Sequence, residues 1–185
     1  MKFYMKLQDW LAGPFSQKMQ KFMQNPYMHA LQVCFTIILP MIMVGSLASL
    51  VNTFRNFAPW LPDLSLINSF SFGLISIFMA FLIPYTIMES KKLQKQKMIT
   101  GFASVSALIA LANPQYVDGN LVINSGYVGT GGMTVAMVMG LVIGWLFSAY
   151  FKHGLFKKDS SLPSVVVVWF ESILIIFVLI LVCII

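Results

Sequence analysis

Charged residues are scarce in this chain. Only 10% of its 185 residues are Asp, Glu, Lys or Arg, whereas 58% are hydrophobic and the mean hydropathy is +0.83. Soluble domains carry about 25% charged residues. The shortage argues against an ordinary soluble domain and predicts a protein embedded in a lipid bilayer.

Arginine is almost absent, because Arg55 is the single arginine among twelve basic residues. The net charge of +6 would suit a nucleic-acid partner. However, bidentate recognition of phosphates and bases favours arginine over lysine. The lysines also lie in short segments between apolar runs, where they act as signals for the orientation of membrane spans. We therefore expect no nucleic acid as a partner.

Cysteine is equally sparse, and the two that are present, Cys34 and Cys183, lie inside apolar runs. They have no Cys/His spacing that would hold a metal, and the chain shows no Ser/His/Asp arrangement. The stretch GYVGTGGM, which begins at Gly126, is rich in glycine but lacks the Lys of a phosphate-binding P-loop. We expect no catalytic residue, no metal and no cofactor.

The N-terminal segment, residues 1–26, predicts an amphipathic helix on the cytoplasmic face of the membrane. The apolar side chains of residues 3–23 fall near one face of a helix and the lysines near the other. Such a helix lies in the interface plane with its lysines toward anionic headgroups. A helix packed on a neighbouring protein surface is the alternative. The segment has no apolar core, so we expect no cleavable signal peptide.

Five apolar stretches in residues 27–185 predict an all-α bundle of five transmembrane helices. They are residues 28–50, 66–88, 98–112, 126–150 and 164–185. Pro40 predicts a kink in the first span, and Pro84 predicts an interruption of the second. The third span is short and rich in small residues, so we expect it to pack among protein. Residues 113–125 are expected to form a loop.

The lysines fall in alternate segments of the chain. Four lie in the N-terminal segment, four in residues 89–97 and three in residues 151–161, whereas the two other loops hold Arg55 alone. Cytoplasmic loops carry an excess of basic residues. This pattern predicts a multi-pass protein of the plasma membrane with its N-terminus in the cytoplasm and its C-terminus outside.

The fourth span carries a ladder of small residues. In a continuous helix, one face would present Gly132, Ala136, Gly140, Gly144 and Ser148. The 25 residues of this span would reach about 37 Å, enough to cross a hydrocarbon core of roughly 30 Å. Small residues at this spacing permit close approach of two helix backbones. The partner helix belongs either to the same subunit or to a second one, and the sequence leaves both open.

Glu171 is the one carboxylate inside a predicted span. A lone charge at the bilayer centre costs roughly 2.5–3.5 kcal/mol on insertion scales. Glu171 is therefore either a residue of a transport pathway or a neutral acid that hydrogen-bonds to a backbone carbonyl or to Ser172. No basic residue lies inside a predicted span to pair with it.

Several stretches together resemble one family. They are WLAGPFSQKMQKFMQNPYM, HALQVCFTIILPMIMVGSLASL, YVGTGGMTVAMVMGLVIGWLFSAYFK and LPSVVVVWFESI. In this order they resemble the amphipathic N-terminal segment and successive spans of EIIC sugar permeases, lactose/cellobiose family, of the bacterial phosphotransferase system (PTS). The third stretch is similar to the family pattern at Gly129, Gly132, Ala136 and Gly140. In the fourth stretch, Val165-Val166-Val167 stands where the family has Val-Pro-Pro.

The resemblance implies a homodimeric permease that takes up a β-disaccharide of the cellobiose or lactose type, with the PTS proteins EIIA and EIIB as partners. It covers the N-terminal half of such permeases, which builds the dimer interface. The family's second half holds re-entrant hairpins and an NEP-type motif, whose glutamate binds the sugar together with a histidine. We expect the chain to end before that half, so no sugar-binding residue is carried over.

Two other functions stay open. The chain could be a non-transporting scaffold or regulator that dimerises with or assists a full-length permease, because five helices without the sugar-binding half lack a pocket for a polar solute. It could also be an unrelated small membrane protein. The resemblance favours the permease component.

Overall fold

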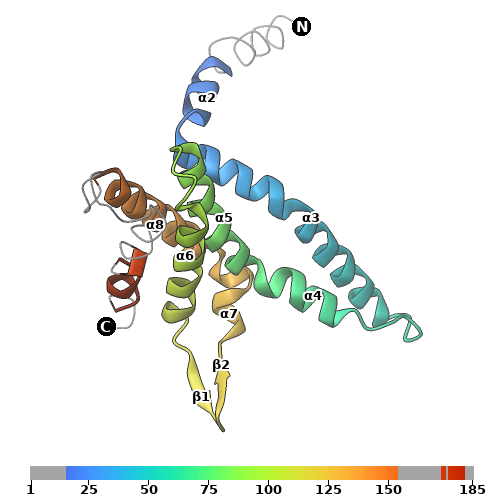
Figure 1. Ribbon diagram of the computed structural model, residues 1–185. Helices are drawn as coiled ribbons and strands as arrows, with labels where there is room; N and C mark the ends of the chain where they lie inside the picture. The colour runs from blue at the N-terminus through green and yellow to red at the C-terminus, as the bar shows by residue number, and fades with distance from the viewer. Residues whose placement is uncertain (1–15, 154–171, 174, 182–185) are drawn as a thin grey trace, which may run out of the picture.

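The computed structural model describes residues 16–153, 172–173 and 175–181, and these are mostly helical (Figure 1). Glu171 and most of the predicted amphipathic segment lie outside the described residues. The α-helices are α2 (Ser16–Met23), α3 (Pro26–Arg55), α4 (Ser65–Ser71), α5 (Ile75–Ser90), α6 (Lys97–Leu111), α7 (Ser125–Val128) and α8 (Met133–His153). Two 3₁₀ turns, η2 (Phe72–Leu74) and η3 (Thr130–Gly132), and two strands, β1 (Gln115–Val117) and β2 (Asn120–Val122), complete the described elements.

Within the described residues, three helical segments are long and apolar enough to cross a membrane. They are Pro26–Arg55, Ser65–Ser90 and Thr130–Lys152. The predicted third span corresponds to α6, whose 15 residues reach about 22 Å, shorter than a hydrocarbon core. Most of the predicted fifth span lies outside the described residues. The structure thus supports a membrane-spanning helical protein, and five spans remain a prediction.

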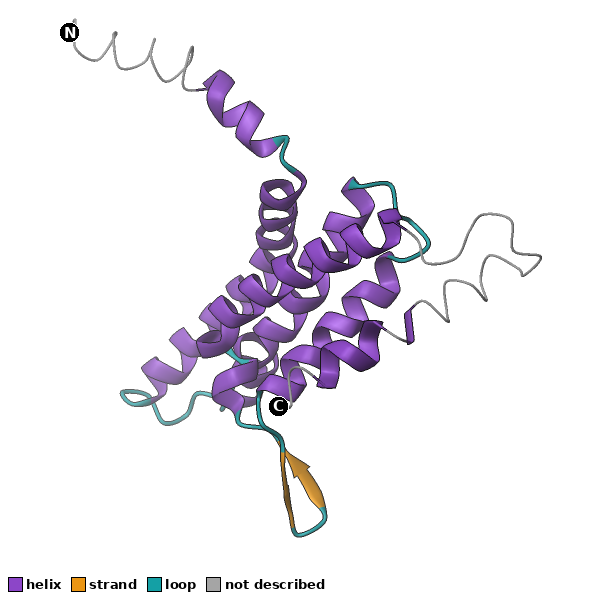
Figure 2. Cartoon of the chain, turned by 90° about the vertical axis from the view of Figure 1, so that its left-hand side faces the viewer, coloured by secondary structure: helices purple, strands orange, loops and turns teal. Residues whose placement is uncertain are grey.

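The break between α2 and α3 occurs at Asn25-Pro26, as the sequence predicts. The side chain of Asn25 accepts a hydrogen bond from the amide of Tyr27 at 3.0 Å, which caps α3. Pro26 occupies the first helical position, where its missing N–H costs nothing. α2 extends away from the other helices (Figure 2). α3 then continues as one α-helix through Pro40.

The second span is interrupted ten residues or more before Pro84, which corrects the prediction from that proline. α4 passes into η2 at Phe72, and α5 runs through Pro84 as an α-helix. The ring of Phe72 lies against Gly45 of α3, where an added Cβ would be 2.8 Å from Cδ2 of Phe72. The interruption therefore occurs where this span contacts α3.

Residues 113–125, which we predicted to be a loop, contain an antiparallel hairpin of β1 and β2. Tyr116 pairs with Leu121, and the turn is Asp118-Gly119. Both turn residues have positive φ, 50° and 79°, as a two-residue type I′ turn requires. Figure 1 shows that the hairpin projects beyond the end of α6.

The fourth span is also interrupted, which corrects the expectation of one continuous helix over residues 126–150. α7 ends at Val128, Gly129 is extended (φ −89°, ψ −155°), and η3 precedes α8. A Cβ on Gly132 would collide with the carbonyl oxygen of Tyr127. The compact turn before α8 therefore requires glycine at this position.

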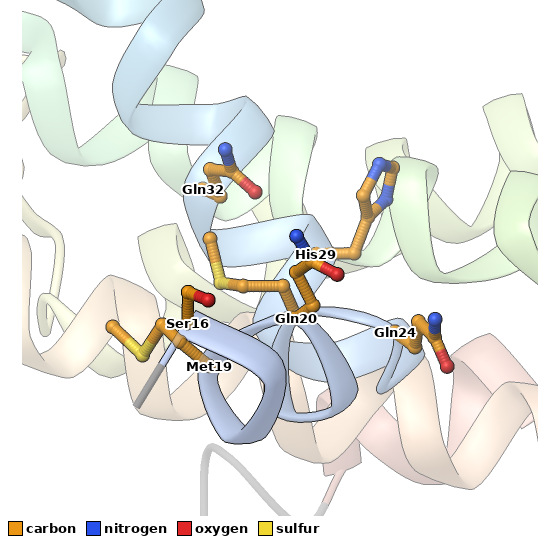
Figure 3. Close-up of a pocket in the computed structure, with 7 residues that line it drawn as sticks. Ser16, Met19, Gln20, Gln24, His29 and Gln32 are labelled. Carbon is orange, nitrogen blue, oxygen red and sulfur yellow. The ribbon is translucent and has the colours of Figure 1, made fainter. Parts of the chain in front are cut away.

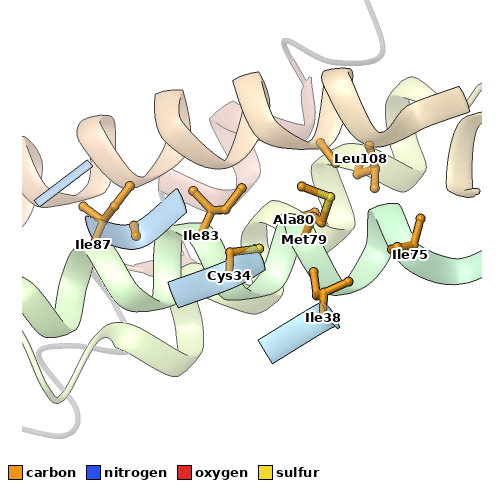
Figure 4. Close-up of a cluster of buried hydrophobic side chains, with 10 residues drawn as sticks. Cys34, Ile38, Ile75, Met79, Ala80, Ile83, Ile87 and Leu108 are labelled. Carbon is orange, nitrogen blue, oxygen red and sulfur yellow. The ribbon is translucent and has the colours of Figure 1, made fainter. Parts of the chain in front are cut away.

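Two clusters of buried apolar side chains hold the helices together. The larger one joins α3, α5, α6 and α8, with Cys34, Ile38, Met79 and Ile83 among its buried members (Figure 4). The second joins α5, α6 and α8 to the described residues near the C-terminus, where Leu179 is 9% exposed. α5 lies at the centre, because it packs against each of α3, α6 and α8.

Candidate functional site: the α5–α8 seam and its polar ends

The small residues of the predicted ladder bring α8 against α5 of the same chain. A Cβ on Gly140 would lie 3.0 Å from the Cβ of Ile83 and 3.3 Å from the Cδ of Pro84. A Cβ on Gly144 would lie 2.6 Å from Cδ1 of Ile87 and 3.3 Å from the Cα of Pro84. We call this contact the α5–α8 seam. The absence of side chains at the two glycines makes room for the proline ring and the two isoleucines.

The other ladder residues occupy different environments. Ala136 is fully buried in the larger cluster. Gly132 lies before α8, in η3, so it belongs to the turn and not to a continuous helical face. Ser148 is 3% exposed near the C-terminal end of α8. Of the two partners that the sequence left open, the described structure places α5 of the same subunit on this face.

A lysine lies at the end of the seam where α5 ends, α8 ends and α3 begins. The Nζ of Lys91 donates to the hydroxyl of Tyr27 at 2.7 Å and to the hydroxyl of Ser148 at 2.7 Å. The same nitrogen lies 4.6 Å from the centre of the Tyr27 ring, so a cation–π contact adds to the hydrogen bonds. Ser148 in turn donates to the carbonyl of Trp145 at 2.9 Å.

A pocket of about 410 Å³ opens beside this lysine. Lys91, Lys152 and Trp145 line it together with Tyr27 and Ser148. The sequence pattern predicts Ser148 as a packing residue only and the two lysines only as signals of orientation. The sequence signal for this site is the pair of lysines that directly follow two apolar spans.

A second pocket, of about 540 Å³, lies at the opposite end, where both interrupted spans meet. It is lined by residues of α4, η2, α7 and η3, among them Asn68, Phe72 and Thr130. Ser76 donates to the carbonyl of Gly129 at 2.5 Å and ties the two interruptions together. The Oδ1 atom of Asn68 is buried, and it has no hydrogen-bond partner within the described residues. Irregular backbone at membrane depth is tolerated where it lines such a cavity.

A third, open pocket of about 740 Å³ lies between α2 and the start of α3 (Figure 3). Gln20 and Gln24 of α2 and His29 and Gln32 of α3 line it, together with methionines of α2. His29 Nδ1 lies 3.4 Å from the hydroxyl of Ser90, at the end of α5. Polar side chains and methionines line this pocket, and no Lys, Arg, Asp or Glu is among its described lining residues.

Charged side chains at or near the ends of the helices form two ion pairs within the described residues. Arg55 and Asp63 meet at 2.7 Å, and Lys97 and Glu89 meet at 2.8 Å. The backbone amide of Ser65, and then its side chain and Arg55, hold the pKa of Asp63 below 3.8. A hydrogen bond to Glu89, and then one to Tyr85, raise the pKa of Lys97. Both pairs help to fix loops at the ends of the helices.

The potential metal ligands of the described residues are dispersed. No group of three or more His, Cys, Asp or Glu side chains lies close enough to hold a metal there. Glu171, the predicted pathway residue, lies outside the described residues.

No protein-family model, curated protein or solved structure matches the chain.

Proposed function

We propose that this chain is the membrane component of a PTS sugar-uptake system of the lactose/cellobiose EIIC type, corresponding to the N-terminal half of such a permease. In this role it works in a bacterial plasma membrane with EIIA and EIIB and contributes to uptake of a β-disaccharide. Its N-terminus and lysine-rich loops face the cytoplasm, and its C-terminus lies outside. It dimerises with a second copy or with a full-length permease.

The observation that carries the proposal concerns the residues on which the resemblance depends. Gly129, Gly132, Ala136 and Gly140 are the positions that are similar to the family pattern. Each lies where the fold leaves little or no room for a larger side chain: against the carbonyl oxygens of Ser125 and Phe72, that of Tyr127, the larger cluster and Ile83, respectively. The similarity therefore falls on positions that set how the spans pack, and not on arbitrary apolar residues.

Reconstitution of uptake tests this proposal. The chain is expressed with EIIA and EIIB in cells that lack their own β-disaccharide permease, with or without a second polypeptide that carries the family's sugar-binding half. We expect labelled cellobiose to enter only when both membrane polypeptides are present. The second polypeptide alone is the control. Absence of uptake although both polypeptides reach the membrane would count against the permease role.

A scaffold that assists a full-length permease is the second candidate, and the exposed apolar face of α3 is the observation behind it. Beyond its contacts with α4 and α5, α3 exposes large apolar side chains along most of its length. They include Phe35 (41% exposed), Leu39 (52%), Met43 (57%), Leu47 (61%) and Phe54 (59%). Such a face packs either on lipid or on another helix. Co-purification of this chain with a full-length permease, together with altered uptake by that permease, would identify the scaffold role.

A further inference from the structure

We infer that the pocket at the lysine-rich end of the α5–α8 seam binds the phosphate group of an anionic ligand, either a phospholipid headgroup or a soluble phosphate. This inference does not depend on the proposed function. The pocket holds about 410 Å³ and has two lysines, two hydroxyls and one indole on its wall. This volume accommodates a phosphate with its ester substituents.

The charge of Lys91 is held in place, and no carboxylate of the described residues forms an ion pair with it. An ammonium has three N–H donors, and two of them serve the neutral hydroxyls of Tyr27 and Ser148. The two ion-paired carboxylates of the described residues are engaged elsewhere, Glu89 with Lys97 and Asp63 with Arg55. A positioned cation with donor capacity therefore faces the pocket.

A second lysine adds positive charge to the same pocket. Lys152 lies one turn beyond Ser148 on α8 and lines the pocket together with Lys91. Two ammonium groups around one cavity favour a ligand with negative charge and several acceptor oxygens, and phosphate supplies both. The hydroxyls of Tyr27 and Ser148 complete a wall of polar groups without adding negative charge.

Trp145 places the pocket in the setting of a membrane headgroup. Its side chain is 57% exposed and lines the pocket near the end of an apolar span. Tryptophan is enriched where spans meet the headgroups, and basic pockets between transmembrane helices bind anionic headgroups. The same chemistry also accepts a soluble phosphate, so the experiment has one arm for each source.

The lipid arm uses Trp145 as the reporter. Trp10, Trp60 and Trp169 are changed to Phe, and the protein is purified in maltoside micelles, which contain no phosphate. Brominated phosphatidylglycerol or brominated phosphatidylcholine is then added, because bromine quenches indole fluorescence only at short range. We expect half-maximal quenching at a lower concentration of phosphatidylglycerol. Lys91→Gln and Lys152→Gln should each raise the concentration of phosphatidylglycerol at half-maximal quenching about fivefold, since a lysine near anionic lipid contributes about 1 kcal/mol.

Lys92→Gln is the matched control. Lys92 is adjacent to Lys91 and exposed, and it is not part of the pocket wall, so its substitution removes the same charge outside the site. We expect the concentration of phosphatidylglycerol at half-maximal quenching to stay within twofold of the parent value in Lys92→Gln. Lys152→Gln keeps the test informative if Lys91→Gln disturbs folding, because Lys152 is exposed and donates no hydrogen bond to the described residues of the seam.

The soluble arm titrates inorganic phosphate into the lipid-free protein and follows the heat of binding. Binding of inorganic phosphate that Lys91→Gln abolishes would identify a soluble ligand, whereas binding of phosphatidylglycerol alone would identify a lipid. Either result supports the site. Equal quenching by the two lipids without a heat of phosphate binding would overturn it. A loss of phosphatidylglycerol binding in Lys92→Gln as large as that in Lys91→Gln would also overturn it.

Discussion

At the scale of single residues, two glycines determine how closely α8 approaches α5. At Gly144, the nearest obstacle is the mobile end of Ile87, but the Cα of Pro84 lies only 3.3 Å from an added Cβ. At Gly140, the obstacles are the Cβ and Cγ2 of Ile83, which are fixed close to the α5 backbone. A larger side chain at either position must push the helices apart, because neither a Cα nor a Cβ atom can rotate away.

We therefore expect Gly140→Leu and Gly144→Leu to destabilise the bundle. Overpacking of a tight contact costs about 1–3 kcal/mol per site. The double variant should lose subunit stability in detergent, measured as a lower midpoint of thermal unfolding. Val138→Leu, on the same helix but 56% exposed, is the control and should leave the midpoint unchanged. An unchanged midpoint in the double variant would mean that the seam does not hold α8 in place.

The residue scale also shows what the sequence could and could not predict about the site. The spacing of Ala136, Gly140, Gly144 and Ser148 was visible as a helical face. Its partner was not, because an i, i+4 ladder fits α5 and a second subunit equally well. Lys91 looked like a topology signal, since nothing local to residues 89–97 reveals that Tyr27 and Ser148 bind its ammonium.

At the scale of elements, hydropathy predicts that helices exist but not where they break. The predicted stretches 28–50, 66–88 and 126–150 overlap the three long apolar segments. The breaks at η2 and η3 depend on contacts between distant parts of the chain, such as the ring of Phe72 against Gly45. The interruption predicted at Pro84 was wrong in position, because a proline can be accommodated in a transmembrane helix when the neighbouring helices leave space for its ring.

The hairpin was predictable in principle, because Asp-Gly between short apolar stretches is a strong signal for a two-residue turn. A substitution in this turn tests backbone conformation alone. Gly119 has φ 79°, and an added Cβ would meet nothing within 4 Å, so Gly119→Ala adds strain without a clash. We expect faster hydrogen exchange of the β1 and β2 amides, with an opening free energy lower by about 1 kcal/mol.

Asn120→Ala is the control for this prediction, because Asn120 lies in β2 beside the turn and has φ outside the positive region. Its exchange rates should stay close to those of the parent protein, and the amides of α5 and α8 should be unaffected by either change. Equal protection of β1 and β2 in Gly119→Ala and in the parent protein would contradict the type I′ turn.

At the scale of the whole molecule, α5 organises the described structure. It packs on α3 and α8, contributes to both apolar clusters and ends at Lys91, which lines the pocket at the lysine-rich end of the α5–α8 seam. The seam ends in a polar pocket on each side, one lysine-rich and one without charged lining residues. The uncharged, apolar length between them is what a bilayer-spanning arrangement requires.

Orientation is a property of the whole molecule that composition predicts most directly. Residues 89–97 and Lys152 lie at one end of the long helices, and the hairpin lies beyond the other end of α6 (Figure 1). In the proposed topology this lysine-rich end lies on one side of the membrane, and the positive-inside rule predicts that this side is cytoplasmic.

Cysteine labelling tests this orientation most directly. In a chain with Cys34→Ala and Cys183→Ala, a single cysteine replaces either Gln94 or Asn120, both of which are exposed and uncharged. A membrane-impermeant maleimide is applied to intact cells and, separately, to permeabilised ones. We predict labelling of Asn120→Cys in intact cells and labelling of Gln94→Cys only after permeabilisation. Labelling of Gln94→Cys in intact cells would contradict the orientation, and with it the account of the lysine-rich end.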